Sequence, residues 1–341
     1  IQYENGTFSM PEMLPYPLTN MNTSLDVDLN LNDKSDINVK YLKANMSNSN
    51  IYLSGTVKDV MDKMYCNINL KANADIDELQ DFIPEGIDAH GKVTLKLAAA
   101  VDNEQITSMN LMDSKINAEL QWKDMNLVYF DTISAVADHI DVKLSLPNTS
   151  SEELTNSLAA LNISGTSLDA RVSDMIVAAL KDYKIDAQIS NVLSETEAVS
   201  VYADYDLSRL DFNMDDINLF INNPSGSLAM FAENDSDDAS YIAVYSGDSL
   251  SFMMGEEMSF ATESLDFNVS AGYDDDQEDI LLKWNPHAGV RLSQAVFSMS
   301  DIEMPIYIPS IDFQYDTTGI VINNSSILMG NSDFAIKGKL T

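Results

Sequence analysis

The chain has 341 residues, of which 54 are acidic and 19 basic, so its formal net charge is −35 at pH 7. A charge of this sign repels phosphate backbones and anionic lipid surfaces, which excludes nucleic acid as an expected partner. The single cysteine excludes an internal disulfide framework, and no segment approaches the ~18 consecutive apolar residues of a membrane-spanning helix. The hydrophobic content of 45% is that of a packed protein.

The first 23 residues are predicted to form an extended arm or an edge segment, because Pro11, Pro15 and Pro17 disfavour a central strand. A regular alternation of apolar and polar residues begins at Ser24 and continues to Asn32. A period of two places the apolar residues on one face of a strand. The same alternation recurs in segments 92–99, 115–123, 140–146, 185–189, 199–207, 250–254, 265–271, 280–284, 311–315 and 334–340. Counting all such segments predicts roughly twenty strands, at the spacing typical of antiparallel folds.

Four short segments have helical spacing instead: 75–83, 131–140, 150–161 and 174–181. The first and third begin with possible capping boxes, which pair Asp75 with Glu78 and Ser150 with Glu153. Four short helices are too few for alternating β-α-β units. We therefore expect them to act as plugs or lids beside an antiparallel sheet.

One ten-residue phrase occurs twice, as NSNIYLSGTV at 48–57 and as NSDFAIKGKL at 331–340. Each copy has a polar turn, then a serine, apolar residues at alternate positions, and a glycine six residues after the serine. Each copy is therefore predicted to be a strand with one apolar face. Recurrence of one strand type favours an array of similar units over a catalytic pocket assembled from unrelated loops.

This number of strands raises a question of geometry. Open twisted sheets rarely exceed about ten strands without curling or splitting into layers, and a flat sheet would expose far more apolar surface than a monomer tolerates. Either two sheets pack together as a dry sandwich, or one long sheet curls into a trough that holds an apolar ligand. Both arrangements need the same alternation, so the periodicity leaves both open.

The two phrases, together with DIDELQDFIP at 75–84, resemble repeats of the AsmA family. The likeness is clearest over residues 20–100 and 300–341. Members of that family are bacterial envelope proteins with an N-terminal membrane anchor and a long periplasmic region. The resemblance implies strands curled into an apolar groove and a role in outer-membrane biogenesis through lipid movement, akin to bridge-like lipid transfer proteins. It also implies a periplasmic segment of a longer protein, tethered to the inner membrane by an anchor outside this chain.

Catalytic and metal-binding patterns are weak. Residues 247–250 match the four-residue signature of GDSL-type esterases, but no Asp lies three residues before any of the three histidines. The residues after Ser249 also continue a strand pattern, whereas that nucleophile would precede a helix. Scattered histidines and one cysteine give a zinc site little support, and Cys66 is expected to be a small buried residue. The acidic segment 274–279 is expected to be a solvated hairpin tip rather than a Ca²⁺ site.

We therefore predict a mainly β fold, an elongated, curled antiparallel sheet with a few short helices; the alternative is a large β-sandwich. Its regions are the arm at 1–23, a first repeat region at 24–124, and a second at 125–341 that continues the first. The predicted function is non-enzymatic shielding of lipid acyl chains, without a cofactor or metal, with envelope membrane proteins as further partners. The alternatives are a structural or adhesive sandwich without lipid and, remotely, a GDSL-like esterase. The residues predicted to contact acyl chains are Leu25, Val27, Leu29, Ile51, Leu53, Val93, Leu95, Leu97, Ile116, Leu120, Phe334 and Ile336.

Overall fold

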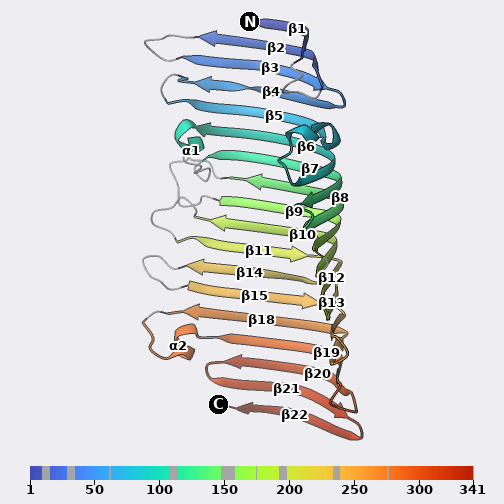
Figure 1. The fold of residues 1–341 in the computed structure, drawn as a ribbon. Helices are drawn as coiled ribbons and strands as arrows, with labels where there is room; N and C mark the ends of the chain where they lie inside the picture. Colours follow the sequence, from blue (N-terminus) through green and yellow to red (C-terminus); the bar gives the residue numbers. More distant parts are fainter. Residues whose placement is uncertain are drawn as a thin grey trace. The chain divides into compact units, whose positions relative to one another are not determined.

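The protein is mainly β, with 22 strands in one antiparallel sheet and three short helices among the described residues (Figure 1). The structure is a computed structural model that describes residues 1–9, 16–28, 35–60, 63–107, 114–146, 158–173, 175–191, 198–232, 239–274 and 276–340. The predicted fold class, an antiparallel β protein with few helices, is confirmed. The chain divides into two compact units: unit 1 comprises 1–164 and 190–195, and unit 2 comprises 165–189 and 196–341.

Unit 1 is a meander in which each strand from β1 to β8 pairs with the next one along the chain. The N-terminal segment enters it as an edge strand, β1, which pairs with β2. Residues 10–15, which include Pro11 and Pro15, lie outside the described residues. The elements are β1 (Gln2–Phe8), β2 (Leu18–Asp28), β3 (Asp36–Met46), β4 (Ser49–Lys58), β5 (Tyr65–Asp75), η1 (Ile76–Phe82), β6 (Ile87–Asp102), α1 (Asn103–Thr107), β7 (Lys115–Tyr129) and β8 (Ile133–Ser145).

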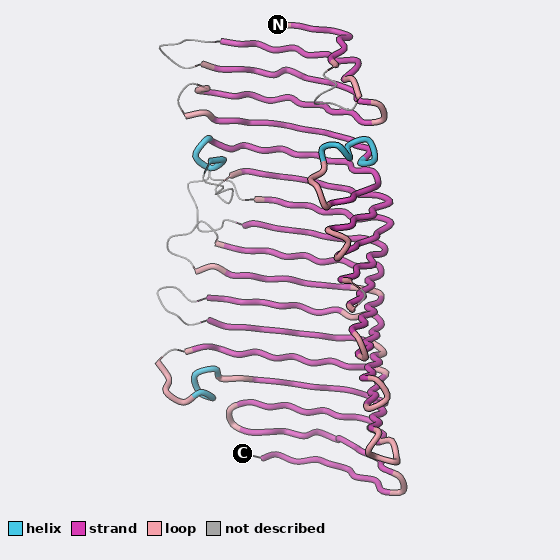
Figure 2. The backbone as a smooth tube through the Cα atoms, viewed as in Figure 1, coloured by secondary structure: helices cyan, strands magenta, loops and turns pink. Residues whose placement is uncertain are grey.

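Unit 2 has two arms. The first arm runs through β11, β14, β15 and β18, and the second through β12, β13, β16 and β17. Both arms end on one long strand, β19, whose residues 287–293 pair with β18 and 296–299 with β17. Figure 1 shows β12 and β13 turned away from β11 and β14, and strands make up most of the trace in Figure 2.

The elements from residue 158 onward include β9 (Leu158–Val172), which crosses the boundary between the units. The others are β10 (Ile176–Ser190), β11 (Ser200–Asp206), β12 (Arg209–Met214), β13 (Ile217–Asn222), β14 (Ser225–Ala232), β15 (Ala239–Gly247), β16 (Leu250–Met254), β17 (Met258–Thr262), β18 (Ser264–Tyr273), α2 (Ile280–Trp284), β19 (His287–Met299), β20 (Ile306–Asp316), β21 (Gly319–Met329) and β22 (Ser332–Leu340). After β19 the chain returns to a simple meander through β20, β21 and β22.

Both copies of the repeated phrase form a strand that follows a turn, as predicted: β4 and β22. Their settings differ. β4 is paired on both sides, by β3 and β5, whereas β22 has the single recorded partner β21. The glycine of the first phrase, Gly55, has a φ of 156° and lies so close to β5 that a Cβ would be 2.2 Å from the Asn67 carbonyl oxygen. At Gly338 of the second phrase a Cβ would meet no atom within 4 Å.

Two of the predicted helices are wrong. Residues 131–140 belong to a hairpin turn and to β8, and residues 176–181 belong to β10. Phe130 and Asp131 both have positive φ values, which suit a tight turn and not a helix start. The β-branched Ile133 and Val136 favour the strand that follows. Of the predicted helix at 150–161, residues 150–157 lie outside the described residues, and 158–161 are in β9.

The segment 280–284, predicted as a strand, is instead the helix α2, and α1 was not predicted. Asp279 starts α2: its carboxylate accepts a hydrogen bond from Leu282 N at 3.2 Å, and its carbonyl accepts one from Lys283 N at 2.7 Å. At α1, the Asp102 carboxylate accepts a hydrogen bond from Gln105 N at 2.8 Å, and Gln105 Oε1 accepts one from Asp102 N at 2.9 Å. This is a capping box, a signal that the sequence contains.

The predicted helix at 75–83 is confirmed as the 3₁₀ helix η1, but the predicted capping box does not form. The Glu78 carboxylate instead binds the turn before β4, accepting hydrogen bonds from Asn48 N at 3.0 Å, Asn48 Nδ2 at 2.7 Å and Ser49 Oγ at 3.0 Å. Ser49 Oγ in turn accepts a hydrogen bond from Asp75 N at 3.0 Å. The asparagine and serine of the first phrase therefore tie η1 to β4.

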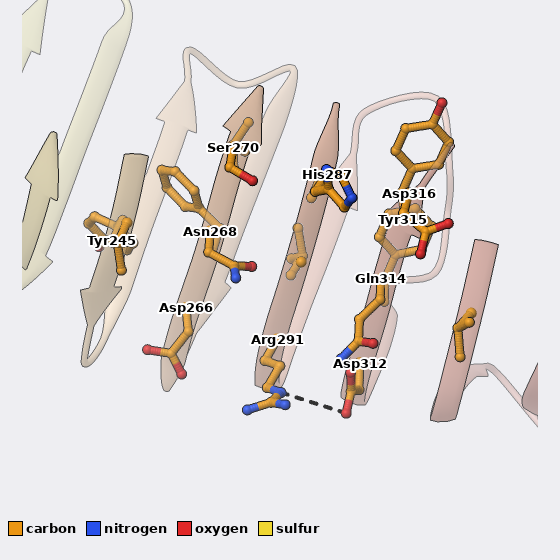
Figure 3. A pocket seen from close by; sticks show the side chains of 18 of the residues that line it. Tyr245, Asp266, Asn268, Ser270, His287, Arg291, Asp312, Gln314, Tyr315 and Asp316 are labelled. Carbon is orange, nitrogen blue, oxygen red and sulfur yellow. Dashed lines mark ion pairs between the residues drawn. The ribbon is translucent and has the colours of Figure 1, made fainter. Parts of the chain in front are cut away.

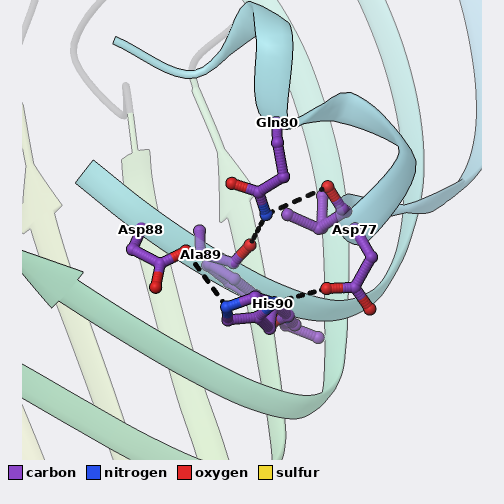
Figure 4. Close-up of polar contacts among 7 residues, drawn as sticks. Asp77, Gln80, Asp88, Ala89 and His90 are labelled. Carbon is purple, nitrogen blue, oxygen red and sulfur yellow. Dashed lines mark hydrogen bonds and ion pairs between the residues drawn. The ribbon is translucent and has the colours of Figure 1, made fainter. Parts of the chain in front are cut away.

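On its other side η1 is bound to β6 (Figure 4). Gln80 Nε2 donates to the Ala89 carbonyl, and the His90 ring bonds to Asp77 through Nδ1 and to Asp88 through Nε2, the latter at 3.0 Å. The hydrogen bond with Asp77, followed by that with Asp88, raises the pKa of His90. Protonated His90 thus links η1 to β6 by charge.

We predict that Gly55→Ala destabilises the protein by about 1–3 kcal/mol, because the new methyl group is forced against the backbone of β5. Gly338→Ala is the matched control at the equivalent position of the second phrase, with an expected change below about 0.5 kcal/mol. The measurement is the midpoint of urea unfolding followed by circular dichroism. Equal midpoint shifts for the two variants would contradict the packing assigned to Gly55.

A second prediction concerns pH. Because the pKa of His90 is higher in the folded state, its contribution to stability is fully present below the unfolded pKa of about 6.5 and is lost as pH rises through the folded pKa. The free-energy gap between wild type and His90→Gln should therefore be larger at pH 5.5 than at pH 8.5. NMR titration of the imidazole should show a lower His90 pKa in Asp77→Asn. A gap that does not change with pH would refute this role.

Candidate functional site: an apolar face with a crease

The sheet of unit 1 has one apolar face, built from rows of side chains that run across the strands. The register aligns Ala44, Ile51, Ala72, Leu95, Leu120 and Val142 in one row, and Leu42, Leu53, Leu70, Leu97, Ala118 and Leu144 in the next. Side chains two residues apart on a strand share a face. The two rows therefore form one continuous apolar surface over β3 to β8.

The register places all nine described unit 1 residues of the predicted acyl-chain set on this face. Ile51, Leu95 and Leu120 are in the first row, and Leu53 and Leu97 in the second. Val93 lies opposite Trp122, and a further row joins Leu25, Val39, Gly55, Ile68, Ala99 and Ile116. Val27 is opposite Ile37, which is opposite Val57. Leu29 lies outside the described residues.

Phe334 and Ile336, the remaining two, are in unit 2 on the edge strand β22. They lie opposite Ile327 and Ser325 of β21. The predicted set therefore includes residues of both units. None of its eleven described members is buried, and four are among the exposed large hydrophobic residues: Val27, Ile51, Phe334 and Ile336.

The opposite face of unit 1 is polar and charged. One row contains Lys43, Tyr52, Lys71, Lys96, Glu119 and Lys143, and another contains Asn45, Asn50, Asn73, Thr94, Gln121 and Asp141. Lys96 Nζ is 2.8 Å from Glu119 Oε2, and Asn73 donates to Asn50 at 3.1 Å. This face is suited to water. The two faces therefore differ sharply in chemistry, although the described residues leave much of the apolar one partly exposed.

Unit 2 repeats this arrangement on both arms. In the first arm one row joins Ala203, Leu228, Ala243, Val269, Ala288, Tyr315, Ile320 and Leu340, and the next joins Tyr205, Gly226, Tyr245, Phe267, Val290, Phe313, Ile322 and Gly338. In the second arm a row contains Phe212, Leu219, Phe252, Phe260, Phe297, Ile306 and Met329. A depression of about 410 Å³ lies in the first arm, lined by residues that include Val201, Leu228, Met230, Tyr241 and Val269.

A crease separates the two arms of unit 2. It is marked by residues with positive φ, namely Asp182, Asn223, Gln294 and Asn324, and by short breaks at 207–208, 248–249 and 263. Unit 1 has its own crease at Gly91 and Asp124, both of which have positive φ, and the β6–β7 register shifts there. An extra residue in the left-handed region is a β-bulge, which bends a strand without ending its pairing.

The sheet in each unit bends toward its apolar face. The side chains that are buried beside the crease lie on that face: Ala89, Met125 and Ala137 in unit 1, and Tyr183, Ile221, Tyr245, Thr262, Ala295 and Ser325 in unit 2. Ala295 has no exposed surface at all. Side chains converge on the inside of a bend and spread apart on its outside, so burial marks the inside. Each unit therefore presents an apolar trough with the crease as its floor.

Polar side chains hold the crease of unit 2 together. Ser208 Oγ donates to Asp182 Oδ2 at 2.9 Å, and Asn223 Nδ2 donates to Asp248 Oδ2 at 2.7 Å. Farther along, Thr262 Oγ1 donates to the Ser293 carbonyl at 2.7 Å. At each break, backbone groups that are no longer paired within the strands form hydrogen bonds across the break. For example, Asn223 N donates to Ser208 O at 2.9 Å.

The esterase-like residues 247–250 belong to this crease. A Cβ on Gly247 would lie 2.3 Å from the Tyr245 hydroxyl oxygen, so the glycine makes room for that ring. Ser249 Oγ accepts a hydrogen bond from Asn222 Nδ2 at 2.6 Å, and Leu250 opens strand β16 opposite Ile221. The partner of Ser249 is an amide rather than a histidine base. Burial raises the pKa of Tyr245 to about 12, so this phenol is neutral at pH 7.

Each unit has one tryptophan on its apolar face. In unit 1, Trp122 lies opposite Val93 and donates from Nε1 to the His90 carbonyl at 2.9 Å, which satisfies a carbonyl freed at the crease. In unit 2, α2 brings Trp284 against Tyr273 and Tyr241, with ring centroids 4.8 and 6.0 Å apart. The helix α2 therefore packs its tryptophan against the first arm.

A second depression, of about 610 Å³, lies over the polar side of β15, β18, β19 and β20 in unit 2 (Figure 3). Its labelled side chains include Asp266, Asn268, Arg291, Asp312 and Asp316. Arg291 Nε is 3.6 Å from Asp312 Oδ2, and Ser246 Oγ donates to Asp266 at 2.5 Å. Arg291 and Asp312 face each other, while Asp266 and Asp316 accept hydrogen bonds from Ser246 and Thr318, so this depression has no single chemical preference.

The histidines, the cysteine and the acidic loop lie apart from one another. His139 Nε2 is 2.6 Å from Asp141 Oδ2 in β8, and His287 Nδ1 is 3.0 Å from the Asn285 carbonyl. Cys66 is buried, as predicted, and burial raises the pKa of its thiol. In the loop before α2, Asp274 accepts hydrogen bonds from Asp276 N and Gln277 Nε2, both at 3.0 Å. Across the described parts of the chain, no three His, Cys, Asp or Glu side chains are arranged to hold a metal ion.

No family model, curated protein or solved structure matches this chain. Within the described residues, no helix has both the length and the apolar character needed to cross a membrane. The apolar faces of the two units are therefore the features that point to a function. Sequence reasoning found the unit 1 face but did not find the phenylalanine row of the second arm or the crease. The phenylalanine row did leave a signal in the sequence, the alternating Phe and Met residues of 250–260.

We predict that Gln294→Gly stabilises the protein by up to about 1 kcal/mol, because glycine adopts the positive φ of 50° at this crease position without strain. Gln314→Gly is the matched control: the same change in the extended strand β20 should cost about 0.5–1 kcal/mol. Urea midpoints of the two variants give the comparison. If both variants are destabilised equally, position 294 is not the strained hinge described here.

Proposed function

We propose that this protein binds lipid acyl chains along the apolar faces of its two units, shielding them from water without chemical reaction. The observation that carries the proposal is the pairing of a continuous, partly exposed apolar face with a charged opposite face. Monomers rarely leave such surfaces uncovered unless they bind something. A trough that bends toward its apolar side suits a long, thin apolar ligand.

The energetics favour a ligand held by many weak contacts. Each buried methylene contributes about 0.8 kcal/mol, so a chain of a dozen carbons binds without a strong polar anchor. The rows of side chains on either side of the crease are suited to such a ligand, because Leu, Ile, Val, Ala and Phe dominate them. The net charge of −35 makes the protein surface acidic, and anionic membranes repel such a surface.

The biological setting is proposed from the sequence resemblance to AsmA-like repeats. In that setting the chain is a periplasmic part of an envelope protein tethered to the inner membrane, and it supports lipid movement for the outer membrane. Envelope membrane proteins would be its partners. The repeated β4 and β22 phrases, each a strand with one apolar face, are consistent with a repeat protein of this kind.

The proposal is tested first by what the purified protein carries. Organic extraction and mass spectrometry of native protein should recover lipid, and an apolar dye should bind saturably and be displaced by phospholipid. The two tryptophans then report on each unit, because brominated acyl chains quench indole fluorescence on contact. We predict quenching in both Trp122→Phe, which reports on unit 2, and Trp284→Phe, which reports on unit 1.

Two matched pairs of substitutions on β6 test whether the apolar or the polar face of the sheet binds the ligand. Leu95→Gln with Leu97→Gln places polar groups on the apolar face of β6, whereas Thr94→Gln with Lys96→Gln alters only the polar face. The first pair should weaken dye and lipid binding about tenfold, the equivalent of 1.4 kcal/mol, and the second should leave it unchanged. No extracted lipid and no saturable dye binding, or equal effects of the two pairs, would refute the proposal.

A further inference from the structure

The hairpin ends of the second arm in unit 2 carry a row of methionines. The register aligns Ile176, Met214, Ile217, Met254, Met258 and Met299 across β10, β12, β13, β16, β17 and β19. The next row inward consists mainly of phenylalanine. Met299 and the nearby Met304 are 38% and 50% exposed. We call Met214, Met254, Met258, Met299 and Met304 the methionine rim.

Each hairpin that carries the rim turns through acidic residues. Met214 is followed by Asp215 and Asp216, Met254 and Met258 flank Glu256 and Glu257, and Met299 and Met304 flank Asp301 and Glu303. All six acidic residues are exposed. No lysine or arginine occurs in 212–219, 252–260 or 297–306. The rim is therefore an apolar strip bordered by charge of one sign.

We propose that the methionine rim docks a basic amphipathic helix of a partner protein. Methionine is flexible and polarisable, so a row of it adapts to the apolar side chains of different helices. An amphipathic helix laid into an apolar groove is a recurrent mode of recognition. Lysines or arginines at the borders of such a helix would face the acidic turns, and this charge complementarity selects a basic partner.

The length of the rim sets the length of the helix. Six adjacent strands are separated by five spacings of about 4.8 Å, or about 24 Å in all. A helix rises 1.5 Å per residue, so about 16 residues cover the rim. Successive turns of the helix are about 5.4 Å apart, close to the strand spacing, so one apolar residue per turn can meet each strand.

The test uses a fluorescein-labelled peptide of 16 residues, made of leucine and lysine in amphipathic helical order. Fluorescence anisotropy at about 0.15 M NaCl measures its binding under physiological screening. A peptide of the same composition, scrambled so that it has no apolar face, measures the contribution of charge alone. We expect saturable binding of the first peptide and at least about tenfold weaker binding of the second.

Variants of the protein locate the site. Glu256→Lys with Glu257→Lys reverses one acidic turn of the rim and should weaken peptide binding about tenfold. Asp276→Lys with Glu278→Lys makes the same change in charge in the loop before α2 and should leave binding within about twofold. Met254→Gln with Met258→Gln keeps the charge and should also weaken binding about tenfold, while circular dichroism confirms that the variant is folded.

The outcomes are decisive in both directions. Weaker binding in the rim variants alone, with the scrambled peptide failing, supports the helix-docking rim. Equal loss in both charge-reversal variants, or equal binding of the scrambled peptide, shows attraction by net charge only and overturns it. Self-association that the rim variants abolish, measured by light scattering, would assign the rim to a second copy of the chain and also overturn it. Peptide competition with lipid is not required, because the rim lies at the hairpin ends and not on the trough floor.

Discussion

Cross-strand register is the constraint on which the rest of the structure depends. A strand that slips by one residue moves its whole apolar set to the other face. In this protein the rows stay aligned across long strands that also turn a corner, as with Leu95 and Met125 on either side of the unit 1 crease. The bulge residues make this possible, because each takes up one extra residue and returns the next side chain to the apolar side. Without these extra residues, the apolar side chains beyond the bend would lie on the polar face of the sheet.

The crease is also where polar residues are needed along the strands. A break in the ladder frees backbone groups that would otherwise be buried without partners. Short polar side chains such as Ser208, Asn223 and Thr262 lie there and bond across the break. Asn and Asp tolerate positive φ better than other non-glycine residues, which fits their use at 124, 182, 223 and 324. The Gly-Asp-Ser-Leu segment is part of this crease: Gly247 leaves room for the Tyr245 ring, and Ser249 accepts a hydrogen bond from Asn222.

Two kinds of surface follow from this framework. The apolar rows beside the crease are uniform, since neighbouring strands contribute similar side chains to them, and they suit ligands without defined polar features. The hairpin ends differ between arms, since turns are free to vary while the rows are not. In the second arm of unit 2 they combine methionine with acidic turns, and the proposed helix docking rests on that combination. Proposed lipid shielding and proposed helix docking thus use different parts of one unit.

The sequence by itself determined the strands, their apolar side and nine of the residues that share it in unit 1, because a period of two is a local property. It predicted helices at 131–140 and 174–181 incorrectly, since apolar residues three or four apart also occur by chance in strands. The tertiary structure alone decided where the sheet bends. Gln294 and Asp182 adopt positive φ only because neighbouring strands must turn at the same row, and that requirement comes from partners distant in the chain. It also decided that the described residues leave the apolar face partly exposed, because burial depends on what packs above a strand and not on the strand's own pattern.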